Sequence, residues 1–517
     1  MSGSKLAVLV AICVCLGASA VVASPYSANV LADQPVRYYR FGEAAGGTAV
    51  DSSTTGANGS YLNSPTLGQP GAIVGDLDTS VRLDGVNQYV SVPSAADLQI
   101  TGDLTIELWY NKVAETGDWV RMVGKGNGTH RTYGLWDWGG ASGRIKFQQY
   151  NSGSSRVEND SNADVPAGQW AHVVATVEGN TTRLYVDGKL DKTVNRSGPP
   201  STSGDPLTIG YAGFHTRFNG YMDEVAIYDH ALTGGRIATH YNVGLGLTYP
   251  QIVAKDMGAA NGAYYRLEET NMAAGQTAVD SIGGDDNGTY YGTLSGAPSF
   301  HHEAGQAASF DGASWVELPS SAFAGYPTSG ATTAWTRTFE TWFRTTDDGV
   351  ILGHTAAGTT PGVAGAGGWV PAVYVDANGN VRASMFWHGA TNRQVVSAGT
   401  YDDGSWHHLV DVYNNGLESL YIDGQLVGAQ GVSVNAYAGG SYDYYLGTGY
   451  ASTWAATAGL VNGWYFFTGD LDETAIYPFA LSAADIQAHY SAGVPEPATL
   501  ALLGLGALAL VRRRRRR

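Results

Sequence analysis

LYVDG at residues 184–188 and LYIDG at residues 420–424 are two copies of one short motif. In the residues that lead into each copy, apolar and polar side chains alternate, which predicts a strand with one buried face. Asp-Gly then suits the positive φ angles of a type I′ turn. The motif therefore predicts a β-hairpin that occurs twice in the chain.

Matching segments lie on both sides of this hairpin, and their order is the same in the two halves of the chain. In order, they are YYRF 38–41 with YYRL 264–267, TAVDS 48–52 with TAVDS 277–281, ELW 107–109 with ETW 340–342, WAHVV 170–174 with WHHLV 406–410, and GYMDE 220–224 with GDLDE 469–473. Each copy closes with a short helix-like stretch, residues 232–241 and 481–490. Repeats of this length are too long for a solenoid and favour two complete domains.

The composition favours many short strands joined by glycine turns. Glycine is 70 of the 517 residues, tyrosine 31 and tryptophan 13, while charged residues are only 15%. We predict an all-β fold of two tandem sandwiches, at residues 25–247 and 262–493. Residues 248–261, which contain a proline and a Gly-Ala-Ala-Asn run, are predicted as the linker.

The N-terminus, residues 1–23, reads as a signal peptide: Lys5 precedes an apolar stretch that ends in small residues. Both cysteines, Cys13 and Cys15, lie inside it, so the exported chain would have no thiol and no disulfide. A cysteine-free exported chain relies on a large apolar core, for which two domains of this length suffice.

The C-terminus, residues 494–517, has three parts in order. Pro495, Glu496 and Pro497 precede an apolar stretch at 498–511, and six arginines close the chain. Fourteen helical residues reach about 21 Å, against about 30 Å of hydrocarbon, so a transmembrane helix here is short. The order of the parts resembles the PEP-CTERM sorting signal, which implies export, transient membrane anchoring through the tail alone, and processing by an exosortase-type protease.

The formal net charge of −17 excludes nucleic acid as a partner, since the surface would repel it. Solubility outside the cell explains the acidity equally well, and divalent cations are the one specific partner that it favours.

The ordered string of repeated motifs resembles the laminin-G-like (LamG) family of the concanavalin A-like lectin/glucanase superfamily. The resemblance covers both copies. It implies that each copy is a jelly roll of two antiparallel sheets, often with a bound calcium ion. The two sorting signals, in turn, predict a location at the cell surface or outside the cell.

Four carboxylates at matching positions are the candidates for a structural calcium site: Glu43 with Asp223, and Glu269 with Asp472. Calcium takes six to eight oxygen ligands, which two carboxylates and neighbouring loop carbonyls could supply. The alternative is that Asp223 and Asp472 accept hydrogen bonds from backbone amides at a bulge or turn.

No catalytic pattern stands out, and we predict that the chain is not an enzyme. Glucanases of this fold carry their acids as Glu-x-Asp-x-x-Glu, and that spacing is absent from the sequence. His172, His407 and His408 are predicted to pack or face solvent, and His240 and His489 to cap the closing helices.

Binding is the predicted activity, through tryptophans that could stack on sugar rings: Trp136 and Trp138 in the first copy, and Trp369, Trp387 and Trp454 in the second. Ordinary packing is the alternative for each of them. We predict a non-catalytic exported surface or matrix protein that binds extracellular carbohydrate or protein. The alternatives are a structural protein of an exopolysaccharide layer without a specific ligand, and a glycoside hydrolase with a rearranged acid pair.

Overall fold

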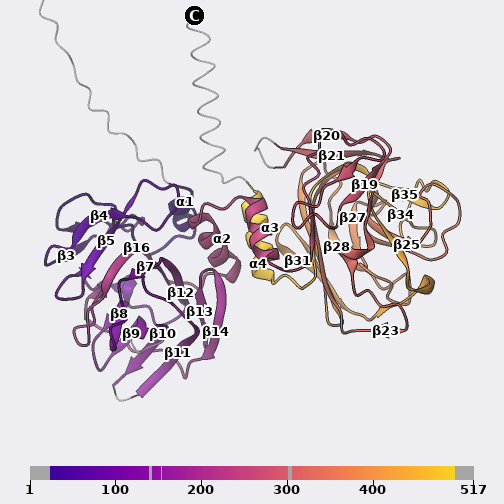
Figure 1. Cartoon of the computed structure of the whole chain (residues 1–517). Coiled ribbons are helices and arrows are strands. Elements are labelled where there is room, and N and C mark those ends of the chain that lie inside the picture. The colour runs from indigo at the N-terminus through magenta and orange to yellow at the C-terminus, as the bar shows by residue number, and fades with distance from the viewer. Residues whose placement is uncertain (1–23, 139–142, 153, 301–304, 495–517) are drawn as a thin grey trace, which may run out of the picture.

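The computed structural model describes residues 24–138, 143–152, 154–300 and 305–494. It shows two β-sandwiches with helices at the junction between them (Figure 1). This confirms the predicted all-β fold of two tandem jelly rolls. The predicted signal peptide, the short C-terminal transmembrane helix and Pro495, Glu496 and Pro497 lie outside the described residues. Within the described ranges, none of the helices has the length and apolar character needed to cross a bilayer.

Each module has one helix before its first strand and one after its last. These are α1 (Pro25–Ala32) and α2 (Gly234–Gly244) in the first module, and α3 (Tyr249–Met257) and α4 (Ala483–Gly493) in the second. The hydroxyl groups of Thr233 and Ser482 cap α2 and α4 by accepting a backbone N–H of the first turn. The predicted linker, residues 248–261, thus contains α3, which occupies the place in the second module that α1 occupies in the first.

The helices of the first module cover one of its two sheets, which we call the helix-side sheet. From edge to edge it consists of β14 (Lys189–Asn195), β13 (Thr181–Val186), β12 (Ala171–Glu178), β7 (Leu104–Lys112), β16 (Asn219–Tyr228), β5 (Thr79–Asp84) and β4 (Thr66–Pro70), and β1 (Arg37–Tyr39) also pairs with β16. Strand β7 alternates, so that Ile106 and Leu108 enter the core between the sheets while Glu107 and Trp109 point to the helices.

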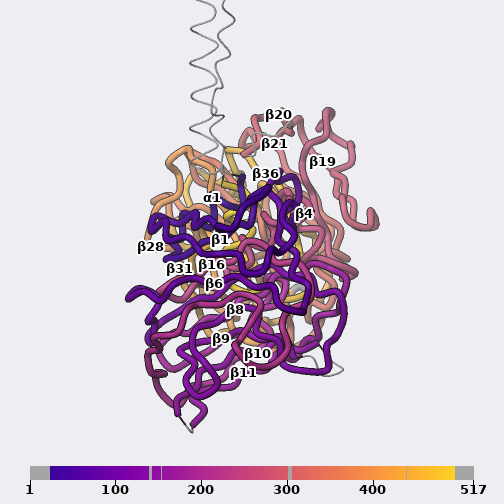
Figure 2. The backbone as a smooth tube through the Cα atoms, turned by 90° about the vertical axis from the view of Figure 1, so that its left-hand side faces the viewer, coloured from indigo at the N-terminus to yellow at the C-terminus, as the bar shows by residue number. Residues whose placement is uncertain are grey.

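The second sheet of the first module lies on the opposite side of that core, and we call it the far sheet. It consists of β11 (Ser154–Asp164), β10 (Arg144–Asn151), β9 (Arg131–Trp138), β8 (Trp119–Gly126), β15 (Leu207–Ile209), β6 (Tyr89–Val92), β3 (Gly59–Leu62) and β2 (Thr48–Ala49). Figure 2 looks at the first module from the side away from the second and shows β6, β8, β9, β10 and β11 stacked across that face. A short 3₁₀ helix, η1 (Ala96–Leu98), lies between β6 and β7.

The second module repeats the strand order of the first, strand for strand, and all pairings within these sheets are antiparallel. Its helix-side sheet is β31 (Gln425–Gly431), β30 (Leu417–Ile422), β29 (His407–Asn414), β24 (Thr336–Arg344), β36 (Thr468–Tyr477), β21 (Gln306–Asp311) and β20 (Ser295–Pro298), with β17 (Ala263–Tyr265) on β36. Its far sheet is β28 (Val395–Thr400), β27 (Asn380–Ala383), β26 (Trp369–Val375), β25 (Gly349–Ala356), β33 (Tyr442–Leu446), β22 (Trp315–Leu318), β19 (Gly288–Tyr291) and β18 (Thr277–Ala278).

The second module also carries additional elements in its loops. They are the strand pair β23 (Ala331–Thr332) and β32 (Val434–Asn435), the strand pair β34 (Thr448–Tyr450) and β35 (Trp464–Phe466), and the 3₁₀ helix η3 (Ala438–Gly440), whereas the 3₁₀ helix η2 (Ser320–Phe323) corresponds to η1. The shared scaffold therefore bears different loops in the two modules.

The two hairpins predicted from the Asp-Gly motif are present. Asp187 and Gly188 have φ angles of 49° and 75°, and Asp423 and Gly424 have 52° and 72°. Glycine also serves packing here, because a Cβ atom on Gly188 would lie 2.9 Å from the side chain of Tyr241 in α2. Each turn thus sits against the closing helix of its own module.

Candidate functional site

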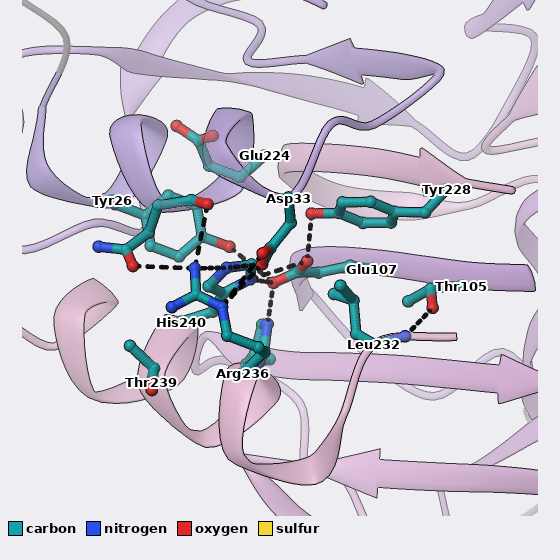
Figure 3. Close-up of polar contacts among 12 residues, drawn as sticks. Tyr26, Asp33, Thr105, Glu107, Glu224, Tyr228, Leu232, Arg236, Thr239 and His240 are labelled. Atoms are coloured by element: carbon teal, nitrogen blue, oxygen red, sulfur yellow. Dashed lines mark hydrogen bonds and ion pairs between the residues drawn. The ribbon is translucent and has the colours of Figure 1, made fainter. Parts of the chain in front are cut away.

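A buried carboxylate occupies the centre of the helix-side sheet in the first module (Figure 3). Glu107 accepts hydrogen bonds from the hydroxyl groups of Tyr26 and Tyr228, at 3.2 and 2.9 Å. Its Oε1 also lies 2.8 Å from His172 Nε2 and 2.9 Å from His240 Nδ1. One side chain therefore joins α1, α2 and strands β7, β12 and β16.

Asp33 completes this network from the end of α1. His240 Nε2 lies 3.0 Å from Asp33 Oδ2, and Arg236 contacts the same carboxylate at 3.0 Å. Burial lowers the pKa of His240, but the charges of Glu107 and Asp33 outweigh it and raise the pKa to about 9. Burial opposes ionisation of Glu107 too, yet His240 and His172 hold its pKa well below the usual value.

The second module builds the same network from the matching residues. Glu340 accepts from Tyr249 at 2.7 Å and Tyr477 at 2.6 Å, and lies 2.7 Å from His408 and 2.9 Å from His489. Asp256 is the second partner of His489, at 3.1 Å, and takes the part of Asp33. The pKa of His489 is raised to about 10, because Glu340 and Asp256 outweigh the opposing effect of burial.

These networks hold structure together and leave no carboxylate oxygen open to a substrate. Glu107 and Glu340 are fully buried and each is bonded on both oxygens. The prediction that His240 and His489 cap helices is wrong, since their rings bridge two carboxylates. His172 and His408, which were predicted to pack or face solvent, are fully buried, and each also bonds the central glutamate of its module.

The carboxylates predicted for calcium are engaged in hydrogen bonds within the chain. Glu43 accepts from the Val50 amide at 2.8 Å and from the Tyr61 hydroxyl at 2.6 Å, and Glu269 makes the matching pair of bonds at the same two distances. Asp223 accepts from the Ala72 amide at 2.7 Å, and Asp472 accepts from the Ser299 hydroxyl at 2.6 Å. Both aspartates sit beside irregularities in strand register.

The grouping and protonation of these carboxylates do not by themselves support a calcium site. Within the part of the chain that the structure describes, no three His, Cys, Asp or Glu side chains are grouped so that they could hold a metal ion. Burial, followed by the charge of Glu224, raises the pKa of Asp223 well above normal, and burial raises that of Asp472 to about 7. Protonated carboxyls are poor ligands. Calcium binding stays a prediction.

The far sheet of the first module carries a cavity of about 230 Å³. Its lining residues are Trp119, Arg131, Trp136, Lys146, Gln148, Glu158 and His215. Of the predicted ligand-binding tryptophans, Trp136 lines this cavity and is 2% exposed. Trp138 is 36% exposed and packs edge-on against Trp119, with ring centroids 3.9 Å apart. We refer to this cavity as the charged pocket.

The far-sheet side of the second module carries a different cavity, of about 280 Å³, which we call the tryptophan pocket. Its lining residues are Gly368, Trp369, Trp387, Thr391, Tyr437, Thr453 and Trp454. The three tryptophans predicted in this copy thus come together from three separate segments. Trp387 and Trp454 meet edge to face at 6.2 Å, and Trp369 Nε1 donates to the Ser452 carbonyl at 3.1 Å.

Several residues of these sites had no signal in the sequence. Arg131 and Lys146 belong to ordinary alternating strands, and Tyr437 follows the unpredicted strand β32. Tyr26 and Asp33 are separated by the same number of residues as Tyr249 and Asp256. That repeated spacing could have revealed that the second copy begins inside the predicted linker.

Two family models match the chain. One, for the concanavalin A-like lectin/glucanases superfamily, matches residues 84–238 and 310–487, one segment in each module. The other, for the PEP-CTERM protein-sorting motif, matches residues 493–516. A comparison with curated proteins gives no match.

Solved structures resemble the chain at low identity. Domain 4 of AbnA, an extracellular arabinanase of Geobacillus stearothermophilus seen with arabinotriose, is 18% identical over 40% of this chain and 98% of its own, with a TM-score of 0.33. A Trypanosoma rangeli sialidase is 16% identical over 40% of this chain, which spans 32% of the sialidase, with a TM-score of 0.31. Domains LG4-5 of the mouse laminin alpha1 chain are 15% identical over 77% of this chain and 88% of their own, with a TM-score of 0.23.

The first family model falls on both sandwiches and covers more than half of the chain. The two segments that it matches lie in corresponding parts of the repeat, and each includes the buried glutamate and the far-sheet cavity of its module. The chain therefore belongs to the laminin-G-like family of the concanavalin A-like lectin/glucanases superfamily, and it ends in a PEP-CTERM protein-sorting motif.

Proposed function

We propose that this is a non-catalytic, exported surface protein whose modules bind extracellular glycan through the cavities beside their far sheets. The sorting motif at residues 493–516 supports export to the cell surface and processing by an exosortase-type protease. The observation that carries the binding proposal is the tryptophan pocket.

The chemistry of that pocket suits a sugar ring. Its lining carries no charged side chain, and three indoles and one phenol supply flat apolar surfaces. Trp369 and Trp387 are only partly buried, so core packing accounts for Trp454 better than for these two. Aromatic faces at a cavity wall are the usual partners for the C–H faces of pyranose rings.

The carboxylates favour binding over hydrolysis. A glycosidase needs two carboxyl groups on either side of the scissile bond, about 5 to 9.5 Å apart. The tryptophan pocket is lined by none, and the charged pocket by Glu158 alone. Glu107 and Glu340, which hold the centre of each buried network, are sealed beneath helices.

Co-sedimentation of the full chain with neutral and acidic polysaccharides, followed by calorimetry on those that bind, tests the proposal. Trp387→Ala should weaken binding of a neutral glycan at least ten-fold, because it removes one wall of the tryptophan pocket. Trp138→Ala is the matched control for that ligand, since it removes a partly exposed tryptophan from the other module. Absence of binding to every polysaccharide, or equal binding by the Trp387 variant, would sink the proposal.

A further inference from the structure

The charged pocket gathers positive charge on a strongly acidic chain. The formal net charge is −17, yet the pocket is lined by Arg131, Lys146 and His215 against the single acid Glu158. Lys146 is neutralised where it stands, because its Nζ lies 3.2 Å from both Glu158 and Asp160. Arg131 has no such carboxylate partner among the described residues.

Two guanidinium groups lie against Trp136, one of the residues that line the pocket. Arg121 and Arg131 lie over the ring of Trp136, at 4.8 and 5.1 Å from its centroid, and both also approach Phe214. Arg121 is 1% exposed, and its Nε and Nη2 atoms have no hydrogen-bond acceptor. Neither arginine has a carboxylate within 4.0 Å among the residues that the structure describes. Burial and the charge of Arg131 together lower the pKa of Arg121 to about 9.

Hydrogen-bond donors at the wall are left without acceptors. The Nε1 atom of Trp136 and the Nε atom of Arg131 are buried and unpartnered. Gln148 fixes the orientation of Arg131, because its Oε1 accepts from that guanidinium while its Nε2 donates to Glu158 at 2.7 Å. Buried donors and like charges without a counterion are costly, so the pocket is arranged for an anion.

We propose that the charged pocket binds a carboxylated sugar, such as a uronic acid residue of an acidic polysaccharide, with its carboxylate facing Arg131 and Trp136. This rests on the proposed function and names the ligand class of one of its two sites. A planar guanidinium matches a carboxylate in two parallel hydrogen bonds. The indole of Trp119, which lines the pocket and packs against Trp138, supplies apolar surface for the sugar ring. The tryptophan pocket, which has no charged lining, would then take a different, neutral sugar.

Calorimetry on the full chain with three probes tests this inference. Oligogalacturonate should bind, and its methyl ester, which has the same backbone without the charge, should bind at least ten-fold more weakly. A sulfated galactan oligosaccharide separates carboxylate recognition from attraction to any anion. The proposal is overturned if the wild-type protein binds the methyl ester as tightly as oligogalacturonate, or binds the sulfated probe more tightly than oligogalacturonate.

Variants then assign the site. Arg131→Gln should weaken oligogalacturonate binding at least ten-fold, and Arg131→Lys, which keeps the charge without the planar fork, should lie between it and the wild type. Arg183→Gln, a more exposed arginine of the same module paired with Glu178, is the control and should bind normally. Unchanged binding by folded Arg131→Gln overturns the inference alone. If the wild type binds neither acidic nor neutral glycans, the proposed function itself is overturned.

Discussion

At the residue scale, Glu107 and Glu340 each bind two hydroxyl groups and two imidazoles, all of them buried. A buried charge with partners this close is expensive to break, because the remaining charge stays in a medium that solvates it poorly. If these positions required only packing, apolar side chains would fill them without the cost of burying a charge. The repetition of the whole set indicates that the network fixes the helices on the sheet.

Glu107→Gln should therefore destabilise the first module by about 3–5 kcal/mol, since it leaves His240 and His172 without the facing charge. Urea unfolding of the full chain, followed by tryptophan fluorescence, measures the loss. Glu178→Gln, at an exposed strand end, is the control and should cost less than about 1 kcal/mol. A Glu107 variant as stable as the control would show that the network is not needed for stability.

Asp223 distinguishes the calcium prediction from its alternative. Its raised pKa and its bond from the Ala72 amide predict that Asp223→Asn, which keeps an acceptor oxygen, changes stability little. Asp223→Ala should cost about 1–3 kcal/mol, because the buried amide loses its acceptor. A calcium site predicts instead that a chelator lowers the thermal midpoint of the wild type and has no effect on Asp223→Asn.

At the element scale, strands and hairpins were predictable and two of the helices were not. Alternation and Asp-Gly turns identify β13 and β30 from a few residues, because a local pattern sets them. Helices α1 and α3 are eight and nine residues long, and each has a proline in its first turn. Such a helix is marginal by itself and is stabilised by packing, here through Tyr26 and Tyr249 against buried glutamates, which no local pattern encodes.

The same distinction applies to the sites. The tryptophan pocket could be predicted in part, because tryptophans in the loop-rich parts of the second copy are uncommon enough to notice, and three of them meet there. The charged pocket could not, because Arg131 and Lys146 acquire their meaning only when β9 and β10 pair. Glu43 and Asp223 were predicted to share a calcium ion because both recur in the second copy. A repeated carboxylate can equally reflect a repeated hydrogen bond to the backbone.

Helix attachment should depend on pH with a definite sign. The pKa of His240 is raised to about 9, so its contribution to stability is complete below the ordinary value near 6.5 and is lost as pH rises through 9. Glu224, whose pKa burial raises to about 8, acts in the same direction. The lowered pKa of Glu107 works oppositely, so its contribution is present above about 4.5 and is lost as the solution becomes more acidic.

We thus expect the free energy of unfolding to fall between pH 6 and pH 10, as measured by urea titrations at several pH values. In Asp33→Asn, His240 keeps one carboxylate partner instead of two, so its folded-state pKa should rise less, and the decline should be smaller and end at a lower pH. Arg144→Gln, an exposed cation on β10 of the far sheet, is a control that leaves the networks of both modules untouched. A flat profile for the wild type over this range would contradict the assignment of charged imidazoles.

At the scale of the whole molecule, the two modules meet through their equivalent closing helices. Small residues allow α2 and α4 to approach: a Cβ on Gly234 would lie 3.3 Å from that of Ala484, and one on Gly235 would collide with Gln487. Polar contacts cross the junction as well, since Lys255 donates to Asn242 at 2.9 Å and Lys189 lies 3.6 Å from Asp256. The helices that cover each buried glutamate are thus also the surfaces that join the modules (Figure 1).

Gly234→Leu should separate the modules without unfolding them. The added Cβ alone would lie 3.3 Å from that of Ala484, so the rest of the leucine side chain would push α4 away, whereas the network around Glu107 is built from other residues of α2 and the sheet. Small-angle scattering should show a larger radius of gyration and a broader distance distribution than in the wild type, while the midpoint of urea unfolding of each module shifts little. Gly204→Leu, in a loop where a Cβ meets no neighbour, is the control.

Because the two pockets belong to different modules, a glycan long enough to reach both would bind the wild type more tightly than the separated variant, and short oligosaccharides would bind both alike. Equal scattering from the two proteins would show that the helix contact does not set their arrangement.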